Sequence, residues 1–287
     1  EIRLSLVGSE MCIRDSVMTD LIENAPEQFS DATYSALRER SVGLGVMGLH
    51  SYYQKKNIPI ESVMSKAWNK KIFEHIQKHV DKASKDLAEE RGACPDDDTA
   101  SVRNAHLLAI APNASSSILC GNTSPSIEPF RANAYTQKTK SGSNLVKNKF
   151  LDELLMTKIG RTDLYEDTWK SIIANRGSVQ HLDMLDEWEK DVFKTAVEIN
   201  QAWIIEHASQ RQQFICQSQS LNLFFPPDVN KGDLHNVHML AWAKNLKTLL
   251  PNNCKVIISD NVLLHTAQLT KTFYPDSITD DYDDTVK

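Results

Sequence analysis

The feature that most constrains the fold is a long amphipathic segment followed closely by a short apolar run. Between Lys66 and Glu90, apolar residues recur every three or four positions, as one buried helix face requires. These apolar positions are Phe73, Ile76, Val80, Ala83 and Leu87. The run from His106 to Ile110 ends at Ala111-Pro112 and predicts a short buried strand. Helices with one buried face that alternate with buried strands indicate an α/β fold.

Further elements continue this alternation. We expect one helix from about Leu185 to Ala208 and another from Leu234 to Leu246. Their apolar positions are Val192, Ala196, Ile199 and Trp203 in the first helix, and Met239, Trp242 and Leu246 in the second. Strands are expected at Leu221–Phe225 and within Val42–Leu49. The chain is therefore predicted to be a helix-rich α/β protein.

Gly43, Gly45 and Gly48 form a cluster that loosely resembles a dinucleotide-binding fingerprint. No clear strand precedes it and no acidic partner follows at a distance, so the pattern is weak. Small residues also permit close packing where a strand enters a helix. We favour packing over phosphate binding for this cluster.

The charge balance excludes some partners. The 287 residues carry a net charge of −6 and a sequence pI of about 5.9, which gives no support for bulk attraction to nucleic acid or an anionic membrane. No apolar run reaches the roughly 18–20 residues that span a bilayer. The cysteines, none in a Cys-x-x-Cys pair, are Cys12, Cys94, Cys120, Cys216 and Cys254. Their spacing argues against a zinc site or a disulfide framework and favours a reducing cytoplasm.

The two ends differ from the middle. Residues 1–16 show neither an amphipathic period nor a signal-peptide core, and SLVGSEMCIRDS resembles a translated sequencing adapter. We therefore exclude residues 1–16 from the fold, as an artefact or a disordered start, and expect the natural protein to begin upstream. Residues 17–250 are the expected folded domain. Residues 251–287 open with Pro251-Asn252-Asn253, end in acidic residues and predict an irregular tail.

The segment that follows the strand at 106–110 has the chemistry of an anion site. Pro112 fixes one backbone angle, and small or polar residues follow it, namely Asn113, Ala114, Ser115, Ser116 and Ser117. Small side chains let a ligand approach backbone N–H groups, and the hydroxyls and the amide add donors. No lysine or arginine lies in this loop, so it differs from a Walker P-loop. On local chemistry alone, a capped helix start explains the loop equally well.

A second polar segment follows at Ser124-Pro125-Ser126-Ile127-Glu128-Pro129. It has the composition of a rigid turn. Glu128 could orient a ligand hydroxyl or cap a neighbouring turn, and the second interpretation is favoured because charged loop residues are mostly solvated.

Four motifs together resemble the large subunit of class I ribonucleotide reductases, most closely its phage and related bacterial branch. They are RSVGLGVMGL at 40–49, RGACP at 91–95, residues 104–148 with APNASSSILCGNTSPSIEPFRANAYTQKTKSGS, and RQQFICQSQSLNLF at 211–224. They stand in the order and at the spacing of the family, and the resemblance extends from about Val17 to Thr248.

The resemblance implies the later part of a ten-stranded α/β barrel and the reduction of ribonucleoside diphosphates to deoxyribonucleotides. It implies that Pro112, Asn113, Ala114, Ser115 and Ser116 bind the substrate diphosphate, with possible support from Ser117 and Glu128. Expected partners are a second large subunit and a metal-containing small subunit that supplies a radical. Thioredoxin or glutaredoxin would be the reductant, and this chain is expected to bind no cofactor or metal itself.

The catalytic machinery of the family is not expected in this chain. The Asn-x-Cys-x-Glu pattern of the radical cysteine does not occur in the sequence, and Cys94, Cys120 and Cys216 are interpreted as small buried residues. Leu249-Leu250-Pro251 stands where the family has a tyrosine pair that relays the radical, which a frame error or a real loss would explain. We therefore expect a fragment that is inactive alone and lacks the nucleotide-sensing, allosteric N-terminal domain.

Two alternative functions remain open at this stage. The chain could be a non-catalytic nucleotide-binding or subunit-interaction module. It could also be part of a cobalamin-dependent reductase, which shares the barrel, although the long match at 104–148 favours class I.

Overall fold

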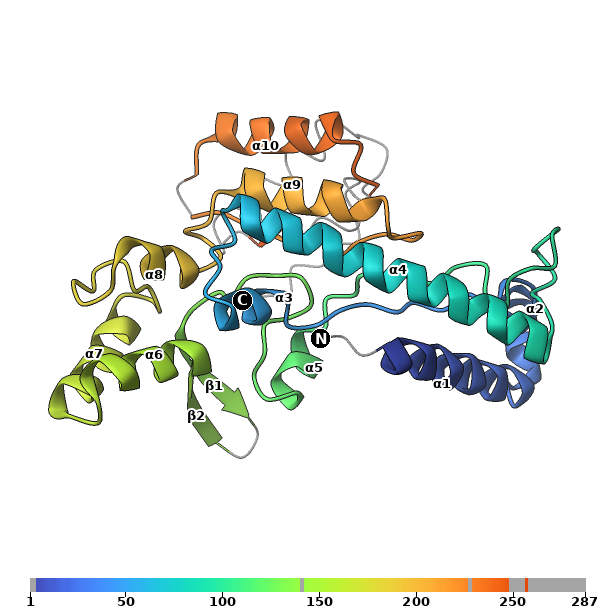
Figure 1. The fold of residues 1–287 in the computed structure, drawn as a ribbon, viewed down its shortest axis with the longest axis horizontal. Coiled ribbons are helices and arrows are strands. Elements are labelled where there is room, and N and C mark those ends of the chain that lie inside the picture. Colours follow the sequence, from blue (N-terminus) through green and yellow to red (C-terminus); the bar gives the residue numbers. More distant parts are fainter. Residues whose placement is uncertain (1–3, 140–141, 227–228, 248–255, 258–287) are drawn as a thin grey trace, which may run out of the picture.

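The computed structural model describes residues 4–139, 142–226, 229–247 and 256–257, which fold into a helix-rich molecule (Figure 1). Its helices are α1 (Leu4–Glu23), the 3₁₀ turn η1 (Glu27–Phe29), α2 (Ser30–Glu39), α3 (Leu49–Lys55), α4 (Val63–Arg91), α5 (Ala114–Leu119), α6 (Lys149–Ile159), α7 (Asp163–Ala174), α8 (Glu187–Val192), α9 (Gln201–Gln212) and α10 (Lys231–Ala243). Its strands are β1 (Ala134–Thr139), β2 (Gly142–Lys147), β3 (Leu223–Phe224) and β4 (Val256–Ile257). In Figure 1, α10, α9 and α4 are stacked in that order.

Three extended segments, far apart in the sequence, lie side by side in parallel. Leu44 forms a bridge with Leu108, and Ile110 forms a bridge with Gln219. The segment 106–110 is therefore the middle one of the three. The apolar run predicted a strand here, and the structure has an extended segment with isolated bridges at Leu108 and Ile110. Parallel neighbours joined through helices are typical of an α/β sheet or barrel wall.

The predicted amphipathic helix is confirmed as α4. Its five predicted apolar positions are all buried, in one core with residues of α9 and the three extended segments. The Ser62 hydroxyl accepts a hydrogen bond from the Ser65 N–H at the start of α4, and Gly92 terminates the helix with φ +86°.

A second core lies under α6, α7 and α8, next to the antiparallel β1–β2 hairpin. It is centred on Leu151, Leu155, Trp169 and Ile172, which are almost completely buried. The protein thus has two apolar cores, and the buried amide side chains of Gln54, Asn133 and Asn148 join them.

The prediction of one helix over residues 185–208 is wrong. The chain forms α8, breaks, and restarts as α9. Glu198 accepts hydrogen bonds from the N–H and hydroxyl of Thr195, and the Asn200 side chain caps α9 by accepting from Ala202. These side chains accept hydrogen bonds from backbone N–H groups that have no helical partner, and this favours the break between α8 and α9.

The helix predicted over 234–246 exists as α10, but its expected apolar face is only partly buried. Leu246 is buried, whereas Met239 and Trp242 are 51% and 74% exposed. The helix packs on α9 through Leu234 and Ala241 instead. Because the sequence of α10 is only weakly amphipathic, its apolar pattern did not identify which side of the helix is buried.

The packing interpretation of the glycine cluster is confirmed. A Cβ on Gly45 would lie 2.7 Å from the carbonyl oxygen of Ala109, on the neighbouring extended segment. Gly48 has φ +82°, and a Cβ there would lie 2.5 Å from the Thr123 hydroxyl. Close approach and a left-handed conformation therefore account for both glycines.

The expectation for residues 1–16 differs from the structure. Residues from Leu4 onward belong to α1, which packs against α4. Asp15 is fully buried and its carboxylate pairs with Arg103 at 2.9 Å and Arg91 at 3.1 Å. An irregular apolar pattern therefore did not prevent burial, since Val7 and Met11 are buried and the buried Asp15 is paired with two arginines. The origin of this segment as an adapter sequence stays a prediction.

Most of the expected tail at 251–287 lies outside the described residues. Within it, Val256–Ile257 forms β4, which pairs in parallel with β3. Among the described residues, no helix is both long and apolar enough to cross a membrane.

Candidate functional site

The candidate site lies where the three extended segments end. The segment from residue 42 leads into Gly48 and α3, the middle segment leads into residues 111–117 and α5, and the third leads into Leu221 and Asn222. Because the three are parallel, their carboxyl ends meet at one edge. In α/β folds this edge is where ligands bind.

The loop at the middle of this edge presents unused backbone donors. Asn113 has φ +50° and precedes α5, and its side chain does not cap the helix. The first backbone hydrogen bond of the helix runs from the Ser117 N–H to the Asn113 carbonyl at 3.0 Å. Within the described residues, the N–H groups of Ala114, Ser115 and Ser116 have no hydrogen-bond partner. They point out of the helix start, as such groups do.

Side-chain exposure separates the loop residues into two groups. Pro112, Ala114, Ser115 and Ser116 are exposed, and Asn113 is half-buried. Ser117 is buried, and its hydroxyl donates to the Ala114 carbonyl at 2.8 Å. The first group can face a ligand, while Ser117 holds the loop in shape.

Glu128 is buried, contrary to the expectation of a solvated loop carboxylate. It accepts a hydrogen bond from the side-chain amide of Asn222, at the end of the third extended segment. Burial raises the pKa of Glu128, and the bond from Asn222 and the charge of Arg131 oppose that rise. The pair thus joins the turn at 124–129 to the same edge of the sheet.

Residues of α3 that sequence analysis did not single out fix the same turn. Ser51 and Ser124 exchange hydrogen bonds, each backbone N–H donating to the other hydroxyl at 3.1 and 2.8 Å. His50 Nδ1 accepts from the Phe130 N–H at 3.0 Å, and burial lowers the pKa of His50 to about 3. A neutral acceptor is therefore held in place. Only the proximity of these residues to Gly48 could have indicated their role.

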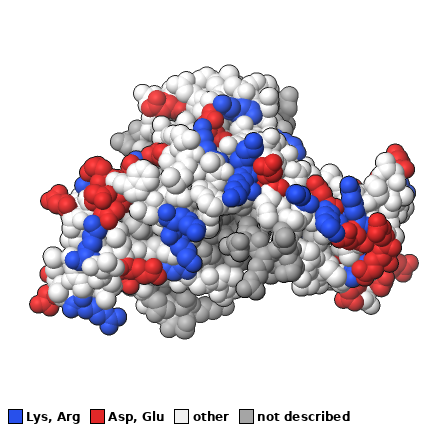
Figure 2. Space-filling model, in the orientation of Figure 1, with Lys and Arg blue, Asp and Glu red and all other residues white. Residues whose placement is uncertain are grey.

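The loop 111–117 contains no lysine or arginine, and Arg131 is the charged neighbour of Glu128 at this edge. Figure 2 shows acidic side chains gathered toward both ends of the molecule, with Lys and Arg side chains both among them and in the middle of this face. No group of three or more potential metal-ligating residues exists in the part of the chain that the structure describes.

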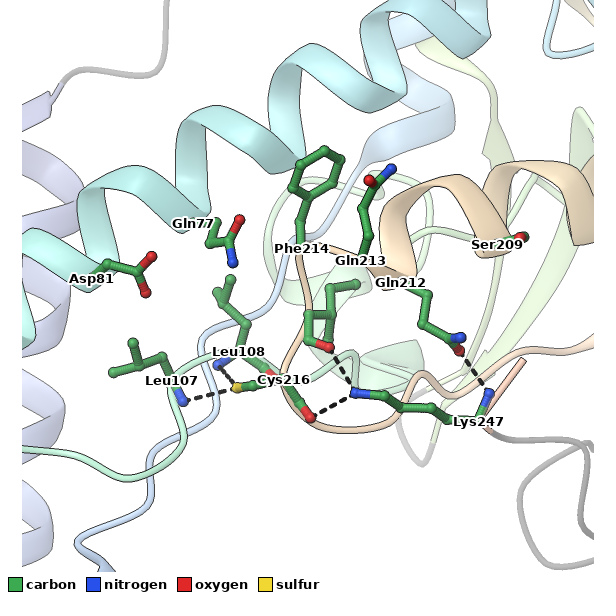
Figure 3. A pocket seen from close by; sticks show the side chains of 11 residues that line it. Gln77, Asp81, Leu107, Leu108, Ser209, Gln212, Gln213, Phe214, Cys216 and Lys247 are labelled. Carbon is green, nitrogen blue, oxygen red and sulfur yellow. Dashed lines mark hydrogen bonds between the residues drawn. The ribbon is translucent and has the colours of Figure 1, made fainter. Parts of the chain in front are cut away.

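A separate cavity lies at the opposite, amino ends of the extended segments (Figure 3). Its volume is about 410 Å³, and its wall includes Leu107, Leu108, Cys216 and Lys247. The Cys216 sulfur accepts from the N–H groups of Leu107 at 3.1 Å and Leu108 at 3.2 Å. Lys247 donates to the carbonyl of Cys216 at 2.8 Å.

The prediction that Cys94, Cys120 and Cys216 are all buried is right only for Cys94. Cys120 follows α5 and is exposed, and Cys216 is exposed beside the cavity. A cysteine's hydrophobicity alone does not decide its burial when it lies at the end of a helix or a strand.

Thiol labelling should reproduce this difference. We expect a small alkylating reagent to modify Cys120 and Cys216 in the folded protein within minutes, and Cys94 only after denaturation, because reaction requires an accessible thiolate. Peptide mass spectrometry with and without denaturant measures this. Rapid labelling of Cys94 in the native protein would contradict the described burial.

Parallel segments, intervening helices and a polar loop at their carboxyl ends are the features of an α/β barrel-type protein. The family model described as "Ribonucleotide reductase, barrel domain" matches residues 13–100 and 97–250. The chain therefore belongs to the ribonucleotide reductase family and is part of its barrel domain.

Individual relatives agree with this assignment. The "Ribonucleoside-diphosphate reductase large subunit" of Invertebrate iridescent virus 6 is 48% identical over 237 residues, covering 82% of this chain and 25% of the viral protein. That of Invertebrate iridescent virus 3 is 45% identical over 252 residues, covering 88% and 40%. The solved class Id ribonucleotide reductase alpha subunit of Actinobacillus ureae is 40% identical, with a TM-score of 0.75, covering 81% and 43%. The chain thus spans less than half the length of each, and the class I resemblance is confirmed.

Proposed function

We propose that this chain supplies the substrate-phosphate part of a ribonucleoside-diphosphate reductase large subunit. The observation that carries the proposal is the row of unpaired N–H groups at Ala114, Ser115 and Ser116, at the carboxyl edge of parallel segments. Exposed hydroxyls on both serines add donors that can turn toward the same anion. The names of the relatives supply the substrate class, a ribonucleoside diphosphate.

In this proposal the loop residues have distinct roles. Pro112 and Asn113 set the direction of the backbone. Asn113 has a left-handed backbone conformation, so the N–H groups that follow it face outward. Ala114, Ser115 and Ser116 bind phosphate oxygens, and the absence of large side chains leaves room for them. Ser117 and Glu128 keep the loop and the adjacent turn in position.

The remaining machinery is proposed from the family. A metal-containing small subunit supplies the radical, thioredoxin or glutaredoxin supplies electrons, and two large subunits associate, in the cytoplasm. The radical cysteine is assigned to none of the five cysteines in this sequence. The chain holds the diphosphate, and the chemistry on the ribose is assigned to the rest of the large subunit.

Calorimetric titration tests the proposal. We expect the chain to bind ADP, CDP, GDP or UDP at least about tenfold more tightly than the parent nucleoside, since two charge-assisted hydrogen bonds are worth more than that difference. Inorganic pyrophosphate should compete. Equal affinities for the diphosphate and the nucleoside, or no competition by pyrophosphate, would refute a phosphate site.

A further inference from the structure

His75 and His79 form a pair of histidines on α4 that the proposed phosphate site does not use. They are four residues apart on one helix, so their side chains lie on the same face, one turn apart. Their ring centroids are 4.5 Å apart and the ring planes are inclined at 61°. Both residues are half-buried. The two imidazoles are therefore direct neighbours at the surface of the helix.

The ring nitrogens of this pair have no partner in the protein. Within the described residues, no hydrogen bond involves either imidazole, and His75 Nε2 is buried without a donor or acceptor beside it. The buried His50 and His207, by contrast, each use a ring nitrogen in a hydrogen bond. Burial of a polar atom without a partner is unfavourable, so the arrangement favours a ligand that binds ring nitrogens.

The surroundings keep His79 in the form that binds metal ions. Burial lowers the pKa of His79, and the charges of three basic neighbours lower it further. These neighbours are His75, Lys78 and Lys82. The imidazole is therefore neutral at pH 7, and a neutral imidazole has a lone pair on one ring nitrogen. Lys82 is paired with Asp86 at 2.6 Å, which reduces the repulsion that a bound cation would meet.

The separation of the two rings fits two ligands of one metal ion. A metal–nitrogen bond to histidine is about 2.0–2.1 Å long, which puts the ion about 3.2 Å from each ring centroid. Two rings at adjacent positions of a tetragonal ion, about 90° apart, then have centroids about 4.5 Å apart. His75 and His79 already have this separation. Tetragonal coordination by nitrogen ligands is typical of Cu²⁺ and Ni²⁺.

We propose that His75 and His79 bind a divalent transition-metal cation of the Ni²⁺ or Cu²⁺ type, with water at the remaining coordination positions. The inference does not depend on the function proposed for the loop 111–117. Two ligands on one helix act as a chelate, because the second imidazole is held next to an ion that the first one binds. The ion bridges one turn of α4, whose Phe73 and Ile76 lie in the larger core, so binding stabilises the folded chain.

Calorimetric titration with Ni²⁺, in a buffer that does not bind metal ions, tests this pair. We expect at least about tenfold weaker binding in His75→Ala and in His79→Ala, because each variant loses the chelate. Alanine is the best helix former, so both variants should fold. His106→Ala is the matched control. His106 is exposed and its ring also has no hydrogen bond within the described residues, and the Ni²⁺ affinity of this variant should be unchanged.

Thermal unfolding gives a second measurement. Ni²⁺ should raise the unfolding temperature of the unaltered chain and of His106→Ala, but not that of His75→Ala or His79→Ala, because an ion stabilises only the state that binds it. Absence of Ni²⁺ binding to the unaltered chain would overturn the inference. Binding that persists in both histidine variants, or is lost in only one of the two folded variants, would also overturn it, since either result assigns the ion to other ligands.

Discussion

Replacing both Ser115 and Ser116 by proline is expected to weaken nucleoside diphosphate binding at least about a hundredfold. The change removes two of the three unpaired N–H groups at the start of α5 and both exposed hydroxyls. Hydrogen bonds to a charged group are worth roughly 1.5–3 kcal/mol each, and about 1.4 kcal/mol corresponds to a factor of ten. Calorimetric titration with the tightest-binding diphosphate measures the loss.

The matched variant replaces Ser115 and Ser116 by alanine. It keeps both N–H groups and removes the hydroxyls, so we expect a loss of only about tenfold if the backbone contributes most of the binding. Ser115 and Ser116 lie in the first turn of α5, so proline removes no intrahelical hydrogen bond there, and the unfolding temperature of both variants checks that the fold persists. A folded double-proline variant with unchanged diphosphate affinity would remove the loop from the site.

Replacing Asn148 by alanine is expected to destabilise the fold by about 3–7 kcal/mol. The buried Asn148 amide donates to the side-chain oxygens of Gln54 and Asn133, both at 2.9 Å. Its own oxygen caps α6 by accepting from the Phe150 N–H at 3.1 Å. The variant leaves two buried acceptors unpaired, at about 1–3 kcal/mol each, and loses a cap worth about 1 kcal/mol. Denaturant unfolding gives the free energy.

The exposed cap Asn230 provides the control for this prediction. Its side chain accepts from the Gly232 N–H at 2.7 Å at the start of α10 and contributes nothing to a buried network. Asn230→Ala should therefore cost about 1 kcal/mol, the value of a cap alone. If Asn148→Ala costs no more than Asn230→Ala, the amide network between the two cores does not stabilise the protein.

The amide network also shows how the two cores are joined. Asn133 donates to the carbonyls of Gly177 at 3.0 Å and Phe193 at 2.7 Å, and Gln54 reaches the Val192 carbonyl at 3.5 Å. Three side chains from separate parts of the sequence thus meet in one place. Nothing in their spacing predicts this, because amides have no periodic signal comparable to that of apolar residues.

Local signals predicted some elements well. The period of α4 was readable because one face of a long helix must be apolar to be buried. The extended segment at 106–110 was readable, although not as a regular strand, because turn-forming residues follow a short apolar run. The break between α8 and α9 was missed, since Glu198 and Asn200 act through hydrogen bonds that a hydrophobic pattern does not record.

The sequence by itself determined the long helix, the polar composition of the loop 111–117 and the family, because each depends on residues that are close together in the chain. The tertiary structure alone decided that Glu128 is buried against Asn222, that Trp242 is exposed, and that Arg211 is buried beside Gln219. These facts depend on which segments become neighbours after folding. Periodicity shows which side of an element is apolar. The role of a buried charged or amide side chain depends on its neighbours in space, and these are far away in the sequence.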